Sequence, residues 1–298
     1  MDFKTFAARR QFVQTSFGRI AYVEMGEGPA ALFLHGVPLN GAHWRDVMNV
    51  VSRQARAIAI DLMGLGHSEV DLDQDLTFPA QAQMTLEVMD ALGVERFDLV
   101  GNDSGGAIAQ ILCVNSPSRV RSLTLTNCDC HDNWPPAAFA QATALAKFGR
   151  LSSVLKGVLD NLALARSDLG LGTGFERPDL LTAELVSAYI APLVATEGRM
   201  AQLDRYVASM DSNQTVSIYD ALRGLHVPTQ ILWGAEDVFF PVEWARWLGR
   251  TIPGTSRVIE IVGARLFFAE ERPYWLADRL MEHWRATSEA PGLAGAES

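Results

Sequence analysis

Short apolar runs and amphipathic segments alternate along the first third of the chain. Nearly continuous apolar runs are typical of strands buried on both faces of a parallel sheet, and they occur at residues 18–25, 30–34, 57–62 and 97–100. Residues 81–92 instead place Met84, Val88 and Leu92 on one helical face. This alternation predicts an α/β fold with a doubly wound, mostly parallel sheet.

The middle of the chain has a different pattern. It contains no strand-like run, but it has Leu- and Ala-rich segments typical of helices at residues 139–148, 151–164, 180–194 and 198–210. The α/β pattern then resumes, with strands predicted at 229–233 and 257–262 and a helix at 273–284. We therefore predict a core in two segments with a helical cap inserted between them and a flexible tail, with boundaries at 1–130 and 216–285 for the core, 131–215 for the cap and 286–298 for the tail.

Composition narrows the classes of function. The 298 residues are 48% hydrophobic and 20% charged, and the formal net charge is −10, which is ordinary for a globular chain with a large core. An acidic chain without clustered Lys and Arg binds nucleic-acid phosphates poorly, so we expect no nucleic-acid partner. No apolar run reaches the ~18 residues of a membrane span, and no secretory leader is visible.

Cysteines and potential metal ligands give no sign of a bound group. The three cysteines, Cys113, Cys128 and Cys130, form no CxxC pair, so we predict reduced thiols and a cytoplasmic location. The glycine-rich residues 170–174 lack the preceding strand and the Gly-Lys-Ser/Thr ending of a phosphate loop. We expect no metal and no cofactor, and a small-molecule substrate as the partner of a monomer or homodimer.

The most specific motif is Leu-Val-Gly-Asn-Asp-Ser-Gly-Gly-Ala at residues 99–107, between a predicted strand and a helix. Gly101 and Gly105 flank Asp103 at the spacing of a nucleophile elbow, a turn so tight that larger side chains would clash. Such a turn holds its central side chain in a strained conformation above the sheet. A centre at Ser104 would put Asn102 where a small residue is needed. Taken alone, the motif also suits a glycine turn whose Asp caps a helix.

Further motifs follow other predicted strands in a fixed order. His35-Gly36-Val37-Pro38 follows the second strand, residues 61–68 follow the third, and residues 233–237 follow a late one. With the elbow, these motifs resemble the α/β-hydrolase superfamily over the whole chain except the tail. An aspartate at the elbow resembles the Asp-nucleophile branch, which includes epoxide hydrolases, haloalkane dehalogenases and fluoroacetate dehalogenases.

The resemblance implies a two-step mechanism and a set of catalytic residues. The carboxylate of Asp103 would attack carbon and form an alkyl ester, which a histidine-activated water would then hydrolyse. The backbone N–H groups of Val37 and Ser104 would form the oxyanion hole of the second step. Asp237 would orient the histidine, and Asp129, after the preceding strand, is the alternative acid.

The catalytic histidine itself is missing from this pattern. Family members carry it in a loop of the form Gly-x-x-His-Phe-x-x-Glu-x-x-Pro, and residues 263–273 align with that loop without a gap. Leu266 stands at the histidine position, and none of the six histidines of the chain aligns there. Leucine cannot take a proton from water, so the chemistry would stop at the ester, use another base, or proceed without an ester.

Candidate substrate-binding residues come from the oxyanion loop and the cap. They are His35, His131, Trp134 and Tyr206. Epoxide hydrolases use two cap tyrosines to protonate the epoxide oxygen, and Tyr206 is the best match for the later one. Haloalkane dehalogenases carry Trp after the nucleophile and often Asn in the oxyanion loop, whereas fluoroacetate dehalogenases carry Arg after the nucleophile. This chain has Ser104 and Val37 at those two positions.

Three hypotheses for function follow. The first is a hydrolase with an Asp nucleophile that acts on an epoxide, an alkyl halide or a related small apolar substrate, as an atypical or trapped variant without the usual histidine. The second is a non-hydrolytic enzyme, such as an isomerase, cyclase, lyase or epimerase of natural-product biosynthesis, in which Asp103 is an acid or base because burial raises its pKa. The third is a catalytically silent ligand-binding protein on the same scaffold.

Overall fold

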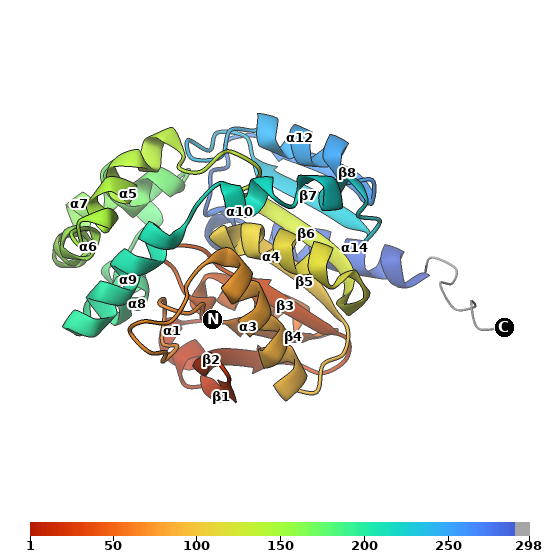
Figure 1. Cartoon of the computed structure of the whole chain (residues 1–298), viewed down its shortest axis with the longest axis horizontal. Helices are drawn as coiled ribbons and strands as arrows, with labels where there is room; N and C mark the ends of the chain where they lie inside the picture. Colours follow the sequence, from red (N-terminus) through yellow and green to blue (C-terminus); the bar gives the residue numbers. More distant parts are fainter. Residues whose placement is uncertain (290–298) are drawn as a thin grey trace.

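Eight strands form one sheet at the centre of the computed structural model, which describes residues 1–289 (Figure 1). Their order across the sheet is β1-β2-β4-β3-β5-β6-β7-β8. β2 is antiparallel to both β1 and β4, and all other neighbours are parallel. The mostly parallel sheet confirms the predicted fold class. The strands are β1 (Gln11–Thr15), β2 (Gly18–Met25), β3 (Ala30–Leu34), β4 (Arg56–Ile60), β5 (Phe97–Asp103), β6 (Val120–Cys128), β7 (Thr229–Gly234) and β8 (Thr255–Ile261).

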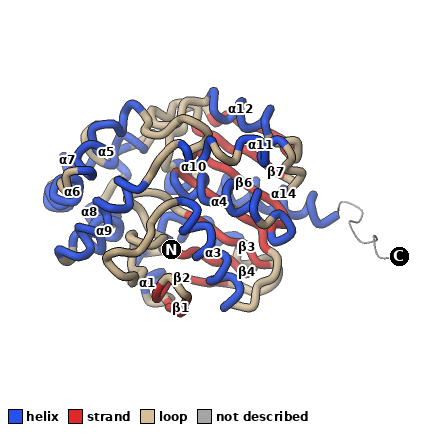
Figure 2. The backbone as a smooth tube through the Cα atoms, in the orientation of Figure 1, coloured by secondary structure: helices blue, strands red, loops and turns tan. Residues whose placement is uncertain are grey.

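Helices flank the sheet, as Figures 1 and 2 show. α3 and α4 pack against each other, with α4 on β5 and β6, while α2 and α14 form a second pair and α12 lies against β7 and β8. These elements are α1 (Phe3–Ala7), η1 (Gly41–Trp44), α2 (Arg45–Val51), α3 (Phe78–Ala91), α4 (Ser104–Asn115), η2 (Pro117–Arg119), α11 (Tyr219–Arg223), α12 (Glu243–Thr251), α13 (Phe268–Glu271) and α14 (Pro273–Glu289).

Burial explains why the central strands read as continuous apolar runs. Every residue of β3 and of β5 is buried, because helices cover both faces of these strands. β8, at the edge of the sheet, alternates between partly buried and exposed positions. The carboxyl ends of β5 and β6 are therefore enclosed by protein, and the residues that follow them lie in a water-poor environment.

Between β6 and β7 the described chain contains helices and no strand, and Figure 1 shows these green elements packed beside the sheet. We call α5 to α9 the cap helices. Before α11, the elements of this stretch are η3 (Ala137–Phe139), α5 (Ala140–Lys147), α6 (Leu151–Asp160), α7 (Leu162–Arg166), η4 (Leu171–Gly174), η5 (Pro178–Leu180), α8 (Ala183–Val194), α9 (Glu197–Ser209) and α10 (Asn213–Val216).

Two predicted helices differ from the observed ones. The single helix predicted at 151–164 is two helices, because Asn161 is extended (φ −136°, ψ 96°) and its side-chain oxygen accepts from the Leu164 N–H to cap α7. The helix predicted at 273–284 continues to Glu289, so the first residues of the predicted tail are helical. The rest of that tail, residues 290–298, lies outside the described residues.

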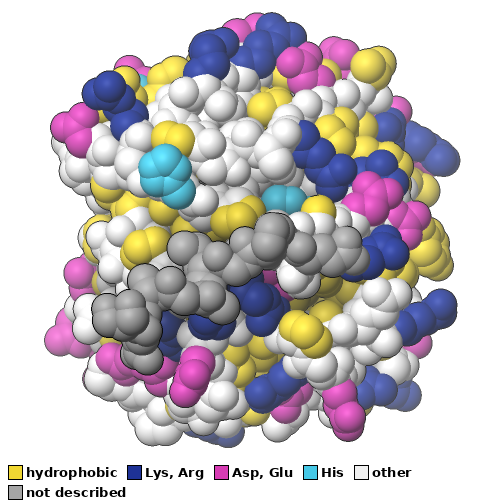
Figure 3. Space-filling model, turned by 90° about the vertical axis from the view of Figure 1, so that its right-hand side faces the viewer, with side chains coloured by type: hydrophobic (Ala, Val, Ile, Leu, Met, Phe, Trp, Pro, Cys, Tyr) yellow, Lys and Arg dark blue, Asp and Glu magenta, His cyan; other side chains and the backbone are white. Residues whose placement is uncertain are grey.

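Charged side chains of both signs are spread over the face of the molecule shown in Figure 3. Lys and Arg side chains lie near Asp and Glu side chains there and do not merge into one basic area on the described part of that face. Among residues 1–289, no helix combines the length and the apolar character needed to cross a membrane.

Candidate active site

The tight turn predicted around Asp103, called the elbow below, is present between β5 and α4. Asp103 has a positive φ (φ 56°, ψ −132°), a backbone conformation that costs free energy in a residue with a side chain. Gly105 lies directly beneath the turn, where an added Cβ would come within 2.4 Å of the His35 carbonyl oxygen. The glycine is therefore required by the close approach of the β3 and β5 loops, as the motif predicted.

Two backbone N–H groups hold the Asp103 carboxylate. The N–H of Val37 donates to Oδ1 at 3.0 Å, and the N–H of Ser104 donates to the same oxygen at 2.6 Å. Both of these N–H bonds go to Oδ1 and neither goes to Oδ2. Burial raises the pKa of Asp103 to about 6, although the two N–H bonds oppose this rise.

A hydroxyl pair lies next to the elbow. Ser104 Oγ and the Tyr206 hydroxyl, which comes from cap helix α9, are 2.8 Å apart, and both side chains are buried. Burial raises the pKa of Tyr206 well above its usual range, and the charges of Asp103 and Asp129 raise it further. The Tyr206 hydroxyl therefore stays protonated and is available as a hydrogen-bond donor.

The loop that would carry the histidine reaches the elbow with Leu266 in it. The Asn102 side chain, one residue before Asp103, donates to the Leu266 carbonyl at 3.2 Å, and the Leu266 side chain is buried. On its other side the loop is bonded to the cap, because the N–H of Phe267 donates to the Gly174 carbonyl at 2.9 Å. The backbone of the loop is thus fixed on both sides, while its side chain at 266 offers no proton acceptor.

Asp237, the predicted triad acid, is bonded to an amide instead of an imidazole. Asn127 Nδ2 donates to its Oδ2 at 2.7 Å, and the N–H of Phe239 donates to its Oδ1 at 2.9 Å. Asn127 is itself oriented, because its oxygen accepts from the N–H of Gly234 at 2.6 Å. Burial raises the pKa of Asp237 to about 7, and these bonds oppose the rise. Asn127 was not among the predicted site residues, because it lies in a strand that the apolar pattern does not reveal.

Asp129, the alternative acid, has no such partners. It directly follows β6, only 1% of its surface is exposed, and neither carboxylate oxygen has a hydrogen-bond partner among the described residues. Its own N–H donates to the Asp103 carbonyl at 3.3 Å, which places the two residues on adjacent strand ends. Burial raises the pKa of Asp129 well above its usual range, and the charge of Asp103 raises it further.

Two of the predicted substrate-binding residues, His35 and His131, contact neighbouring parts of the fold through their rings. The His35 ring bonds to the Gly36 carbonyl through Nδ1 at 2.9 Å and accepts from the N–H of Leu62 through Nε2 at 3.1 Å. Burial lowers its pKa to about 4, so His35 is neutral and its nitrogens are both occupied. The His131 ring stacks on Trp247, with centroids 4.9 Å apart, and contacts Tyr219 as well. The sequence placed His131 at the cap entrance but could not show this aromatic stack.

The other cap prediction, Trp134, is nearly buried. Its ring packs on Phe139, with ring centroids 5.6 Å apart. Of the predicted cap contacts, Tyr206 is the one whose side chain the structure bonds to an elbow residue. Among the described residues no group of three or more His, Cys, Asp or Glu side chains is arranged to bind a metal ion.

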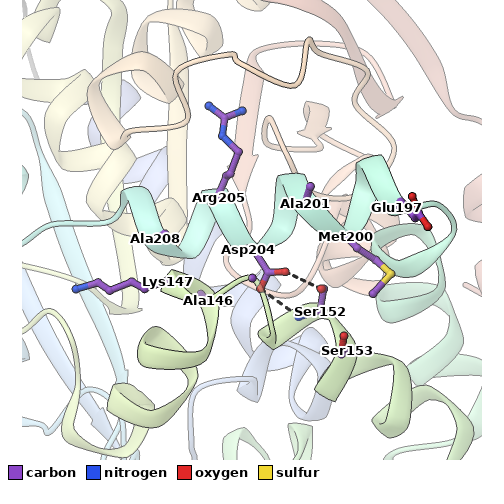
Figure 4. Close-up of a pocket in the computed structure, with 11 residues that line it drawn as sticks. Ala146, Lys147, Ser152, Ser153, Glu197, Met200, Ala201, Asp204, Arg205 and Ala208 are labelled. Atoms are coloured by element: carbon purple, nitrogen blue, oxygen red, sulfur yellow. Dashed lines mark hydrogen bonds between the residues drawn. The ribbon is translucent and has the colours of Figure 1, made fainter.

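A pocket of about 480 Å³ opens elsewhere on the cap, between α9 and the α5–α6 segment (Figure 4). Its Asp204 points from α9 toward Ser152 on α6 and accepts from the N–H and the hydroxyl of that residue. It also accepts from the N–H of Leu151, so it caps the start of α6. The carboxylate in this pocket therefore has a structural role.

Comparison with known proteins identifies the family of this chain. The sequence model described as alpha/beta hydrolase fold matches residues 29–273. The chain belongs to this family.

The relatives of this alpha/beta hydrolase are enzymes of several kinds. It is 26% identical to haloalkane dehalogenase 2 of Mycobacterium tuberculosis, over 95% of this chain and 97% of that protein. It is 28% identical to a 2-hydroxymuconate semialdehyde hydrolase of a Pseudomonas species, over 76% of this chain and 78% of that protein. The solved structure of the epoxide hydrolase CorEH superposes with a TM-score of 0.79 at 18% identity, covering 93% and 98% of the two chains, which shows likeness of fold.

Proposed function

We propose that this alpha/beta hydrolase uses Asp103 as a nucleophile toward a tetrahedral carbon of a small, largely apolar substrate. The observation that carries the proposal is the pair of N–H bonds to Oδ1. In a hydrolase with a serine nucleophile, the substrate's carbonyl oxygen fills the oxyanion hole. Here an oxygen of the nucleophile itself fills it, so Oδ2 is presented to a carbon that carries a leaving group, and attack forms an alkyl ester.

An epoxide suits the surroundings of Asp103 better than an alkyl halide does. Ring opening leaves an alkoxide, which needs a proton donor, and the Ser104–Tyr206 hydroxyl pair lies beside the nucleophile. A leaving halide is held by N–H donors, and the side chains of Val37 and Ser104 supply none. The haloalkane dehalogenase among the relatives makes an alkyl halide the alternative substrate.

The ester would then be hydrolysed by water that attacks Cγ of Asp103. The oxyanion that forms is Oδ1, which the N–H groups of Val37 and Ser104 already hold, so its stabilisation needs no rearrangement. The residue that would take a proton from this water is not at position 266. The proposed function therefore covers ester formation and the stabilisation of this oxyanion.

Mass spectrometry of the intact protein tests the proposal. The protein is incubated with a panel of epoxides and alkyl halides and quenched at short times, and the peptide containing residues 101–107 is sequenced for an added alkyl group. We expect an adduct on Asp103 that is absent from Asp103→Asn. A panel without any adduct, together with no product in solution, would contradict the proposal.

A non-hydrolytic reaction is the second candidate function, and one observation favours it. The carboxyls of Asp103 and Asp129 are both buried and their pKa values are both raised, which suits proton transfer to and from a substrate. Product analysis separates the two functions. If a substrate is converted to an isomer without uptake of heavy oxygen from labelled water, Asp103 acts as an acid or base and not as a nucleophile.

A further inference from the structure

A buried carboxyl without hydrogen-bond partners lies one strand away from the nucleophile. Neither oxygen of Asp129 is bonded to a described residue, although its surface is almost entirely covered. Buried polar groups are nearly always hydrogen-bonded, and an unpaired buried carboxylate is strongly destabilising. Asp237 is a contrast within the same protein, because both of its oxygens accept hydrogen bonds.

Backbone contacts fix Asp129 next to Asp103. β5 and β6 are parallel neighbours, with Asp103 paired to Cys128, and the N–H of Asp129 donates to the Asp103 carbonyl. From α4, Gln110 Nε2 donates to the Asp129 carbonyl at 2.8 Å. The position of Asp129 thus depends on the same strand and helix that form the elbow.

We propose that Asp129 exchanges the proton that the missing histidine would exchange, donating it during ester formation and taking it from water during ester hydrolysis. This inference rests on the proposed function. It assigns a reacting role to a carboxyl that would otherwise only orient a histidine. The charge of Asp103 raises the pKa of Asp129, and the charge of Asp129 in turn raises the pKa values of Cys128, Cys130 and Tyr206. None of these groups is a cation.

The charges of the pair explain why the proton moves at the right time. Two adjacent buried carboxyls share one proton, because ionising both would bring two negative charges close together away from water. In the free enzyme Asp103 is the better candidate for the ionised form, since two N–H groups bond to it and none bonds to Asp129. When Asp103 becomes a neutral ester, the repulsion that kept Asp129 protonated disappears, and its proton is released more easily.

Atoms and charge balance over the cycle. In ring opening, Oδ2 of Asp103 bonds to the epoxide carbon, the carbon–oxygen bond breaks, and the proton of Asp129 passes to the new alkoxide. Asp129 is then a carboxylate. It takes a proton from water as the water oxygen bonds to Cγ of Asp103. Collapse of the intermediate releases the diol, leaving Asp103 ionised and Asp129 protonated, and the net reaction is epoxide plus water to diol.

The test compares Asp129→Asn with Asp132→Asn, which makes the same chemical change at an exposed position in the same segment. With an epoxide that labels the wild-type protein, we expect Asp129→Asn to lower diol formation by ~100-fold or more, the range of general acid–base catalysis. The Asp103 adduct should form more slowly in this variant, because the proton donor of ring opening is lost, and it should persist once formed, because the base that removes it is lost too. Its detection also shows that the site is folded. Asp132→Asn should turn over like the wild type, and Asp129→Glu, which keeps a carboxyl, should restore part of the rate.

Two results would overturn the inference in different ways. If Asp129→Asn forms diol at the wild-type rate, or if the wild type itself stops at the adduct, Asp129 is not the base, and the proposed nucleophile stands. If neither the wild type nor Asp129→Asn gives adduct or diol with any member of the panel, the proposed function fails, and the inference fails with it.

Discussion

Single side chains decide what chemistry this site supports. Leu266 removes the usual proton acceptor, but the carbonyl of the same residue is still bonded by Asn102. The Asn127 side chain donates to the carboxylate of Asp237, the residue predicted to orient a histidine. Asp129 is buried, and its carboxylate has no hydrogen-bond partner among residues 1–289. The surroundings of Asp103 therefore include two further buried carboxyls, Asp129 and Asp237, and the Tyr206 hydroxyl.

Leu266→His is expected to accelerate hydrolysis of the ester. The loop is held on both sides, so an imidazole at this position would lie beside the elbow without a backbone shift. In the Asp129→Asn background we expect the second substitution to raise the single-turnover rate of ester decay by ~100-fold, because it supplies a base. Time-resolved mass spectrometry measures this rate. An unchanged decay rate would indicate that Asn127 holds Asp237 too firmly for the imidazole to be oriented.

The raised pKa of Asp103 has a consequence for stability. A carboxyl whose pKa is about 6 when folded and 3.8 when unfolded binds more protons in the folded state, so its contribution to stability is present below about pH 4 and lost as the pH rises through about 6. Asp103→Asn should therefore raise the free energy of unfolding at about pH 8, by up to ~3 kcal/mol, and change it little at about pH 4.

Urea unfolding at the two pH values measures this difference, with Asp132→Asn as the exposed control. Asp237, with a pKa of about 7, acts in the same direction and extends the loss of stability to a slightly higher pH. A wild-type protein that gains stability between about pH 4 and 7 relative to Asp103→Asn would contradict the prediction.

At the scale of elements, apolar periodicity predicted the strands with nonpolar interiors and missed the others. β3 was located at its observed bounds because all its residues are apolar. β6 was not located, since Ser122, Thr124, Thr126 and Asn127 interrupt its pattern, yet all are buried and most bond to neighbouring strands or loops. The apolar pattern also missed β1, because β1 is a partly exposed edge strand.

This limit also explains which site residues the sequence revealed. Asp103 and the two N–H donors lie in motifs whose glycines dictate the turn, so their geometry follows from spacing. The Asn127–Asp237 bond, the Ser104–Tyr206 pair and the isolation of Asp129 depend on contacts between segments far apart in the chain. A single sequence holds no local signal for such contacts. The ring contacts of His35 and His131 likewise cannot be predicted from the residue type alone.

The geometry at Gly105 and Gly157 predicts opposite effects of Ala substitution on the free energy of unfolding. In Gly105→Ala the new Cβ would lie 2.4 Å from the His35 carbonyl oxygen, which is backbone and cannot move aside. We expect a loss of at least ~2 kcal/mol in the free energy of unfolding, or failure to fold. Gly157 lies within helix α6, is exposed, and has no atom near its Cβ position. Gly157→Ala should add ~0.5–1 kcal/mol, and equal effects in urea unfolding would contradict this reasoning.

At the scale of the whole molecule, a buried ionic cluster joins the core to the cap. Arg45 of α2 donates to both oxygens of Glu270 at 2.7 Å, and the Tyr189 hydroxyl of cap helix α8 donates to the same carboxylate. Burial opposes ionisation of Glu270, but Arg45 and His43 outweigh it and lower its pKa. The cluster connects the loop that carries Leu266 to both parts of the molecule.

Glu270→Gln tests this connection. It leaves the buried Arg45 without its main counter-ion, so we expect a loss of ~3 kcal/mol in the free energy of unfolding and faster proteolysis of the cap helices. The control is Arg246→Gln, which removes an exposed ion pair with Glu260 and should cost less than ~1 kcal/mol. Similar losses in the two variants, measured by urea unfolding and limited proteolysis, would show that the buried cluster does not tie the cap to the core.

The filled oxyanion hole also determines how the protein would behave in chemical proteomics. Fluorophosphonate probes label serine hydrolases by placing a phosphoryl oxygen in this hole, and here Oδ1 of Asp103 already accepts from both of its N–H groups. Such probes should leave the protein unlabelled, although its fold is that of the enzymes they were designed to capture. A tagged epoxide would alkylate Oδ2 instead. We therefore expect an alkylating reagent to label this protein and allow its recovery from a mixture.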